Sequence, residues 1–130
     1  MTSNTNDMGI DILIADDEVE FASTLAMRLE LRKFQVRTVN SGGDALAAIE
    51  VSVPDILLLD LKMPDLDGLE VLAMLREKYP SLKVIILTGH GSFQSGREGM
   101  ELGAYDYVMK PVDLSRLITI VREACGHDPA

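Results

Sequence analysis

The stretch "DILLLDLKMPDLDG", residues 55–68, places an acidic side chain at the end of a dense apolar run. Four apolar residues, 56–59, lead directly to Asp60, and Lys-Met-Pro follows at once. The run has the length and the continuous hydrophobicity of a strand that is covered on both faces. An ionised carboxylate beside a core is costly unless it has a partner. We therefore expect a buried strand that ends at a site with other charged groups.

Four more short apolar runs alternate with segments of helical spacing. We expect strands at residues 10–15, 34–39, 55–60, 83–88 and 105–110. We expect helices after Asp17, from residue 41 to about residue 51, from Gly68, over residues 92–103 and after Asp113. This alternation predicts an α/β fold, a doubly wound parallel sheet in the order 2-1-3-4-5 with helices on both faces.

Length and composition indicate one domain. The chain has 130 residues, of which 47% are hydrophobic, enough for one well-buried core. We expect a disordered N-terminus at residues 1–9, a folded domain at 10–126 and a C-terminal tail at 127–130.

Charge and cysteine content limit the partners and the compartment. Twelve basic residues against 21 acidic ones give a net charge of −9, which disfavours nucleic acid or an anionic membrane as the main partner. The single cysteine, Cys125, excludes an intrachain disulfide and fits a reducing compartment. No apolar stretch approaches the roughly 18 residues of a membrane span. We expect a soluble cytoplasmic protein.

Four of the five expected strands end in a charged or reactive side chain. In a doubly wound sheet, ligands bind beyond the carboxyl ends of the strands, where the winding direction reverses. The first strand leads to Asp16 and Asp17, the third ends at Asp60, the fourth at Thr88 and the fifth at Lys110. The second, which ends in "VNSGG", brings no such group.

Three carboxylates at one edge of a sheet repel one another, so a cation must offset their charge. Oxygen ligands in an open site favour Mg²⁺ over Ca²⁺, which needs a fuller cage. Mg²⁺ in turn usually accompanies a phosphoryl group. Lys110 then supplies a positive charge for the phosphoryl oxygens, Thr88 a hydroxyl donor, and Asp60 a nucleophile that can form an acyl phosphate.

Taken together, these residues resemble the receiver domain of bacterial two-component response regulators. The resemblance extends from residue 10 to about residue 125 and implies a flavodoxin-like (βα)5 fold. Its motifs are the pair Asp16 and Asp17, "DLKMP" with Asp60, "TGHG" from Thr88, and "AYDYVMKP" with Tyr107, Lys110 and Pro111. The last two motifs also resemble receivers that are joined to transcriptional activators of the nitrogen-regulation class.

The resemblance implies a role for each matching residue. Asp60 would be the phosphoacceptor, Asp16, Asp17 and Asp60 the carboxylate ligands of Mg²⁺, and the backbone carbonyl of Lys62 a further ligand. Thr88 would bond the phosphoryl group, Lys110 would pair with it, Tyr107 would be the aromatic switch, and the Lys110–Pro111 peptide bond would be cis.

The function implied is a phosphorylation switch. A sensor histidine kinase or a histidine phosphotransfer protein would donate a phosphoryl group from its phosphohistidine to Asp60, and the new conformation would control binding to an unknown downstream effector protein. Enzyme-like activity would be limited to self-phosphorylation from small donors and autodephosphorylation. The alternatives are a phosphatase that uses the same aspartyl phosphate chemistry, or an interaction module that is never phosphorylated.

Each residue also has a purely structural interpretation. Asp17 would be a helix N-cap, Asp60 a cap of the following turn, and Thr88 a strand-end hydroxyl. Lys110 would be a solvated charge and Tyr107 a packing residue. "DLDG", residues 65–68, matches neither a haloacid-dehalogenase motif nor an EF-hand loop, and we expect a turn into a helix there.

Two further hypotheses concern features that are individual to this chain. The helix expected at 92–103 contains Gly96 and Gly99, each of which costs about 1 kcal/mol relative to Ala. Either this helix is mobile until phosphorylation orders it, or its glycines pack closely on a neighbour. Lys62 and His90, two residues beyond Asp60 and Thr88, would modulate the lifetime of the acyl phosphate or would be solvated rim side chains.

Overall fold

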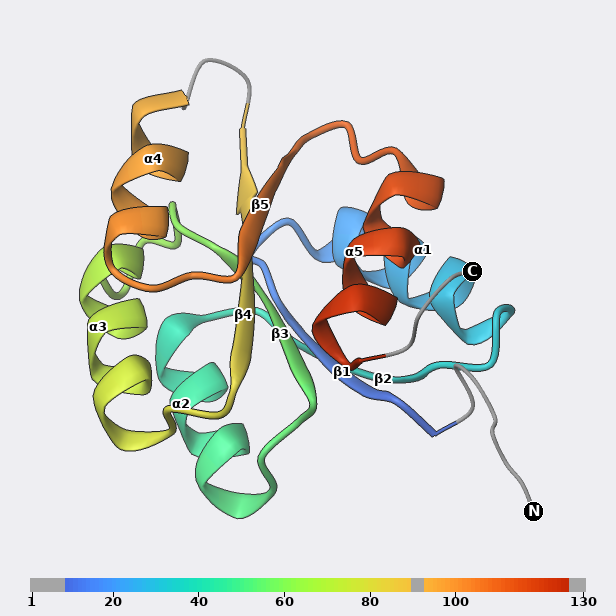
Figure 1. Cartoon of the computed structure of the whole chain (residues 1–130), viewed down its shortest axis with the longest axis horizontal. Coiled ribbons are helices and arrows are strands. Elements are labelled where there is room, and N and C mark those ends of the chain that lie inside the picture. The colour runs from blue at the N-terminus through green and yellow to red at the C-terminus, as the bar shows by residue number, and fades with distance from the viewer. Residues whose placement is uncertain (1–8, 90–92, 127–130) are drawn as a thin grey trace.

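Five parallel strands form one sheet in the order β2-β1-β3-β4-β5, which is the predicted order (Figure 1). The structure is a computed structural model that describes residues 9–89 and 93–126. The strands are β1 (Asp11–Ala15), β2 (Gln35–Val39), β3 (Ile56–Asp60), β4 (Lys83–Thr88) and β5 (Asp106–Met109). Each strand lies within the apolar run that predicts it.

Five helices cover the sheet, with α1 and α5 on one face and α2, α3 and α4 on the other (Figure 1). They are α1 (Val19–Glu30), α2 (Gly42–Val51), α3 (Gly68–Lys78), α4 (Phe93–Glu101) and α5 (Leu114–Ala124). Side chains cap the starts of three helices: Ser41 accepts the Asp44 N–H, as the sequence predicts, Asp67 accepts the Leu69 N–H, and Asp113 accepts the Arg116 N–H. Within the described ranges, no helix is both long and apolar enough to cross a membrane.

The central strand β3 is buried on both faces along its whole length. Ile56 and Leu58 pack in the core beneath α1 and α5, and Leu57 and Leu59 pack in the second core beneath α2, α3 and α4. Successive side chains of a strand point to opposite faces, so a continuous apolar run fills two cores at once. The same run fixes Asp60 at the end of the strand.

The strand register brings the polar ends to one edge of the sheet. Ala15 pairs with Leu59, so Asp16 follows at the level of Asp60. On the other side of β3, Asp60 pairs with Leu87, so Thr88 stands one residue further along. Lys110 continues β5 beyond the last pair of β4 and β5.

The glycines of α4 face the sheet at very short range. A Cβ atom on Gly99 would lie 1.9 Å from Cδ1 of Ile86, and one on Gly96 would lie 2.9 Å from the Tyr107 ring. These distances confirm the close-packing interpretation of the two glycines. The hypothesis that α4 is mobile before phosphorylation stays a prediction.

Candidate functional site

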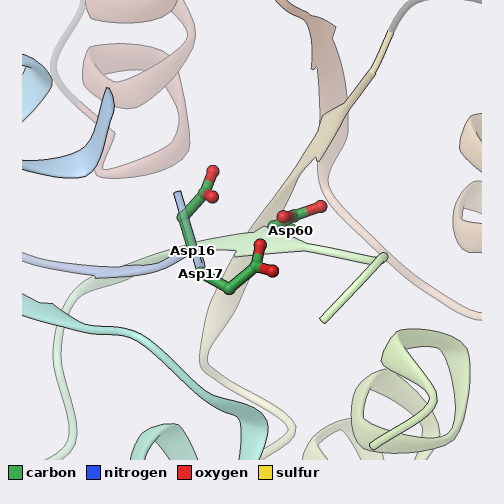
Figure 2. Close-up of side chains that lie close together, drawn as sticks. All are labelled: Asp16, Asp17 and Asp60. Carbon is green, nitrogen blue, oxygen red and sulfur yellow. The ribbon is translucent and has the colours of Figure 1, made fainter. Parts of the chain in front are cut away.

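Three carboxylates meet beyond the carboxyl ends of β1 and β3 (Figure 2). Asp16, Asp17 and Asp60 each place an oxygen within 4.8 Å of the other two. Asp16 and Asp60 are buried and Asp17 is exposed, so the cluster has one side open to solvent. The structure thus brings together the three carboxylates that the sequence predicts.

Asp16 is held from three directions. Its Oδ1 accepts the backbone N–H of Glu18 at 2.9 Å, and its main-chain carbonyl accepts Nδ2 of Asn40 at 2.9 Å. Its Oδ2 is fully buried and has no hydrogen bond of good geometry, although the ammonium of Lys110 lies 2.8 Å away as an ion pair. A buried carboxylate oxygen left in this condition is suited to a cation.

Asp60 occupies an environment that opposes ionisation. Its Oδ1 accepts the Lys62 N–H at 3.0 Å, and its Oδ2 lies 3.8 Å from the Lys110 Nζ. Burial raises the pKa of Asp60 to about 6; the Lys62 N–H and the Lys110 charge lower this pKa in part, and the charge of Asp16 raises it further. A second positive charge at the cluster would favour the ionised, nucleophilic form.

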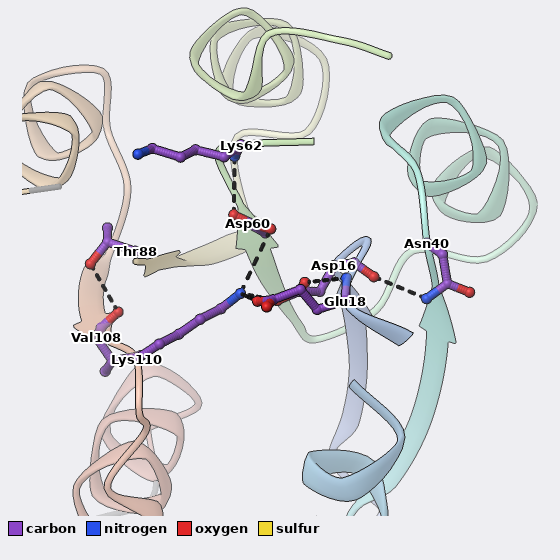
Figure 3. Close-up of polar contacts among 8 residues, drawn as sticks. All are labelled: Asp16, Glu18, Asn40, Asp60, Lys62, Thr88, Val108 and Lys110. Carbon is purple, nitrogen blue, oxygen red and sulfur yellow. Dashed lines mark hydrogen bonds and ion pairs between the residues drawn. The ribbon is translucent and has the colours of Figure 1, made fainter. Parts of the chain in front are cut away.

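Lys110 is the cation of the site (Figure 3). Besides Asp16 and Asp60, its ammonium contacts Oε1 of Glu18 and lies 4.5 Å from the centroid of the Phe21 ring. Burial by itself lowers the pKa of Lys110, but the neighbouring carboxylates of Asp16, Glu18 and Asp60 outweigh it and raise the pKa. Lys110 is therefore a half-buried partner of these carboxylates and not a solvated charge.

Thr88 is the last residue of β4, and Tyr107 lies on β5. Thr88 is buried, and its hydroxyl donates to the Val108 carbonyl at 3.4 Å, which is the strand-end interpretation. Tyr107 is half-buried and packs with the core beneath α2, α3 and α4, with its ring against Gly96. Both side chains lie where the sequence predicts, and their part in signalling stays a prediction.

The remaining predicted residues divide into three cases. The Lys110–Pro111 peptide bond is cis, as predicted. The Lys62 side chain is exposed and extends outward from the Asp60 carboxylate (Figure 3). His90 lies outside the described residues.

The structure overturns the N-cap interpretation of Asp17 and agrees with a local turn contact at Asp60. Asp17 is not the N-cap of α1, because Glu18 occupies that position and makes no capping hydrogen bond through its side chain. Asp60 accepts the N–H two residues along, as in an Asx turn, but the residue that caps α3 is Asp67. The turn predicted at residues 65–68 is confirmed.

Four residues near the site were missed by the sequence reasoning. Glu18 and Phe21 contact Lys110, and their position in the first turn after the acidic pair is the only signal for them. Asn40 follows β2, which brings no charged group to this edge, as predicted, yet it fixes the backbone of Asp16. No pattern in the sequence indicates the fourth, Asp65.

Asp65 ties the segment after β3 to the start of α2. Its two carboxylate oxygens accept the N–H groups of Gly42 and Gly43, each at 2.9 Å. These backbone bonds, that of Gly43 first, lower the pKa of Asp65. The contact holds the chain that leaves Asp60 against a neighbouring helix.

The donor set fits a hard divalent cation. All three side chains offer carboxylate oxygens, and no His or Cys joins them in the part of the chain that the structure describes. Such ligands suit Mg²⁺, which is usually bound by one or two carboxylates with waters and phosphate oxygens. Asp16 Oδ2 is buried without a hydrogen bond, and the pKa of Asp60 is raised. An added positive charge would stabilise both carboxylates in their ionised form.

Comparison with known proteins agrees with this geometry. The family model described as the response regulator receiver domain matches residues 12–122. The chain is 32% identical over 117 residues to the DNA-binding transcriptional regulator NtrC of Proteus hauseri, and that alignment covers 90% of this chain and 25% of NtrC. It is 34% identical over 119 residues to the nitrogen assimilation regulatory protein NtrX of Azorhizobium caulinodans, covering 90% and 26%. The chain thus spans about a quarter of the length of these curated relatives.

Solved structures give the same result. The receiver domain of NtrX from Brucella abortus superposes with a TM-score of 0.85 at 33% identity, over 91% of this chain and 100% of that one. A response regulator receiver domain protein from Clostridium thermocellum superposes with a TM-score of 0.84 at 31% identity, over 89% and 94%. On sequence, fold and site together, the chain belongs to the response regulator receiver domain family.

Proposed function

We propose that this domain is a phosphorylation switch of a two-component system and that Asp60 is its phosphoacceptor. The observation that carries the proposal is the position of the Asp60 carboxylate. It ends the central strand, shares a cluster with Asp16 and Asp17, and has the Lys110 ammonium 3.8 Å from one oxygen. A nucleophilic carboxylate with a cation close by is suited to phosphoryl transfer.

The donor is a phosphohistidine of a sensor histidine kinase or a histidine phosphotransfer protein. A carboxylate oxygen of Asp60 attacks the phosphorus of a phosphohistidine whose second ring nitrogen is protonated, the new O–P bond forms as the P–N bond breaks, and neutral imidazole leaves. In autodephosphorylation, water attacks the same phosphorus, inorganic phosphate leaves and the carboxylate is restored. Lys110 pairs with the phosphoryl oxygens, and Thr88 donates its hydroxyl to them.

Asp16, Asp17, Asp60 and the backbone carbonyl of Lys62 are the residues that would hold Mg²⁺. When bound, Mg²⁺ neutralises charge on the carboxylates and on the phosphoryl oxygens. The protein's own contribution is to keep Asp16 buried and oriented by Glu18 and Asn40, so that the cluster is assembled before the cation arrives.

The signal passes from the phosphoryl group to α4. To bond the phosphoryl group, the Thr88 hydroxyl must leave the Val108 carbonyl, and this changes the contacts of β4 with β5. Tyr107 lies on β5 with its ring against Gly96 of α4, so it is placed to act as the aromatic switch. Such a change alters which effector protein the domain binds.

The effector is a protein and not DNA bound directly by this domain. The net charge of −9 opposes contact with a phosphate backbone. Because the relatives named NtrC are DNA-binding transcriptional regulators, we infer that the effector acts on transcription in the cytoplasm. Lys62 and His90, which follow Asp60 and Thr88 by two residues in the sequence, tune the lifetime of the acyl phosphate.

Intact mass spectrometry tests the proposal. The wild-type protein, incubated with acetyl phosphate and MgCl₂, should gain the mass of one phosphoryl group, and Asp60→Asn should not. Chelation of the metal should abolish the gain. If the wild type gains nothing, or if the variant gains equally, Asp60 is not the acceptor. Sustained turnover of p-nitrophenyl phosphate would instead favour the phosphatase.

A further inference from the structure

The first turn of α1 binds the ammonium of Lys110 through two side chains. Glu18, the N-cap residue of α1, contacts Nζ through Oε1, and the Phe21 ring lies with its centroid 4.5 Å from the same atom. The two residues are three apart at the start of a helix and so lie on one side of it. Together they offer an anion and an aromatic face to one cation.

The contacts with Glu18 and Phe21 hold the Lys110 ammonium close to α1 and Asp16. Nζ lies 2.8 Å from Asp16 Oδ2 but 3.8 Å from Asp60 Oδ2, beyond hydrogen-bonding distance (Figure 3). An ammonium has three N–H donors, and in the structure Asp16 and Glu18 engage it most closely. A phosphoryl group on Asp60 must therefore compete with these carboxylates for the same hydrogens.

Asp16 and Glu18 differ in what happens to their charge when the site is loaded. Asp16 belongs to the acidic cluster, so a divalent cation held there would offset its attraction for Lys110. Glu18 stands outside that cluster, so its ion pair with Lys110 would remain. Glu18, Phe21 and Lys110 are among the residues that line a groove of about 530 Å³ between α1 and residues 110–112. This groove leaves the Lys110 side chain room to move.

We propose that Glu18, supported by Phe21, forms a resting site that holds Lys110 back from the phosphoryl group on Asp60. Glu18 is thus a positioning residue that acts through Lys110 and slows the gain of the phosphoryl group. The inference rests on the proposed function. It adds that the ion pair between Glu18 and Lys110 competes with the phosphoryl group on Asp60 for the lysine.

The test compares Glu18→Gln with Glu20→Gln. Glu20 is an exposed residue in the same turn of α1, so its variant loses the same charge without touching Lys110. With acetyl phosphate and Mg²⁺, Glu18→Gln should be phosphorylated about two- to fivefold faster than Glu20→Gln, as the loss of one ion pair of this kind implies. Phe21→Leu should shift the rate in the same direction.

A second measurement needs neither phosphate nor metal. Nuclear magnetic resonance of ¹⁵N-labelled protein should show the Lys110 ammonium hydrogens exchanging faster with water in Glu18→Gln than in the wild type or in Glu20→Gln. Glu18→Gln matching Glu20→Gln in both rate and exchange would overturn the resting site. A rate below that of Glu20→Gln would show that Glu18 assists Lys110, which also contradicts the inference.

The failure of the proposed function looks different. In that case the wild type would gain no phosphoryl group at all. Glu18 would then have no phosphoryl group to compete with for Lys110. The change in exchange of the Lys110 hydrogens would still show the contact between Glu18 and Lys110.

Discussion

Replacing Asp60 with Asn should make the metal-free protein more stable at neutral pH. The wild-type carboxylate is buried beside Asp16, and burial raises its pKa from 3.8 to about 6. A carboxyl group whose pKa is higher in the folded than in the unfolded state destabilises the folded state when it is ionised. The cost is therefore small below about pH 4, grows as the pH rises toward 6, and is complete above about pH 7. Asn keeps the shape and can still accept the Lys62 N–H, but it carries no charge.

The size of the effect follows from the shift in pKa. A rise of about 2 units corresponds to about 3 kcal/mol at neutral pH. Solvent at the open side of the cluster screens part of this energy, so we expect a net gain of about 1–2 kcal/mol.

Urea unfolding in EDTA at pH 7.5 and at pH 4.5 measures the gain. Asp60→Asn should unfold at a higher urea concentration than the wild type at pH 7.5, and the difference should shrink at pH 4.5. Glu20→Gln, which removes one exposed charge from α1, serves as the control and should change little. A variant that is no more stable than the wild type at pH 7.5, or equally stabilised at both pH values, would refute the electrostatic account of the site.

Three other changes test separate parts of the account. Gly99→Ala should destabilise the domain by about 1–3 kcal/mol in thermal unfolding despite its better helix propensity, because its Cβ meets buried Ile86, and adding Ile86→Val should restore part of the loss. Lys62→Ala and His90→Ala should change the dephosphorylation rate more than the yield of phosphorylation, and unchanged rates would remove the proposed rim role. Hydrogen exchange in α4 should be faster than in the sheet and should slow on phosphorylation, whereas equal protection beforehand would contradict a helix that phosphorylation orders.

The architecture was predictable because it depends on local patterns. Five apolar runs and the helical spacing between them define a parallel sheet, and the continuous run of residues 56–59 identifies β3 as its buried centre. Once the strand order is known, the strand ends meet at one edge, so Asp16, Asp17, Asp60, Thr88 and Lys110 could be assigned to one site before any coordinates.

Contacts between side chains from distant segments were not predictable in this way. Asp65 is 23 residues from Gly42, and no spacing rule relates an acid in one turn to the first N–H groups of another helix. The close packing of the two glycines of α4 depends on Ile86 and Tyr107 from other elements, so their spacing in the sequence could not reveal it. Glu18 is an ordinary acid at a helix start until Lys110, from the far end of the chain, is placed beside it.

The central claim is that the phosphoryl group is carried by Asp60 itself. Borohydride reduces an acyl phosphate to an alcohol, so a phosphorylated aspartate is converted to homoserine. After treatment with acetyl phosphate and Mg²⁺ and then borohydride, peptide mapping should find homoserine at position 60 and at no other aspartate. Homoserine at Asp16, at Asp17 or at no position, in protein that has gained the phosphoryl mass, would contradict the account.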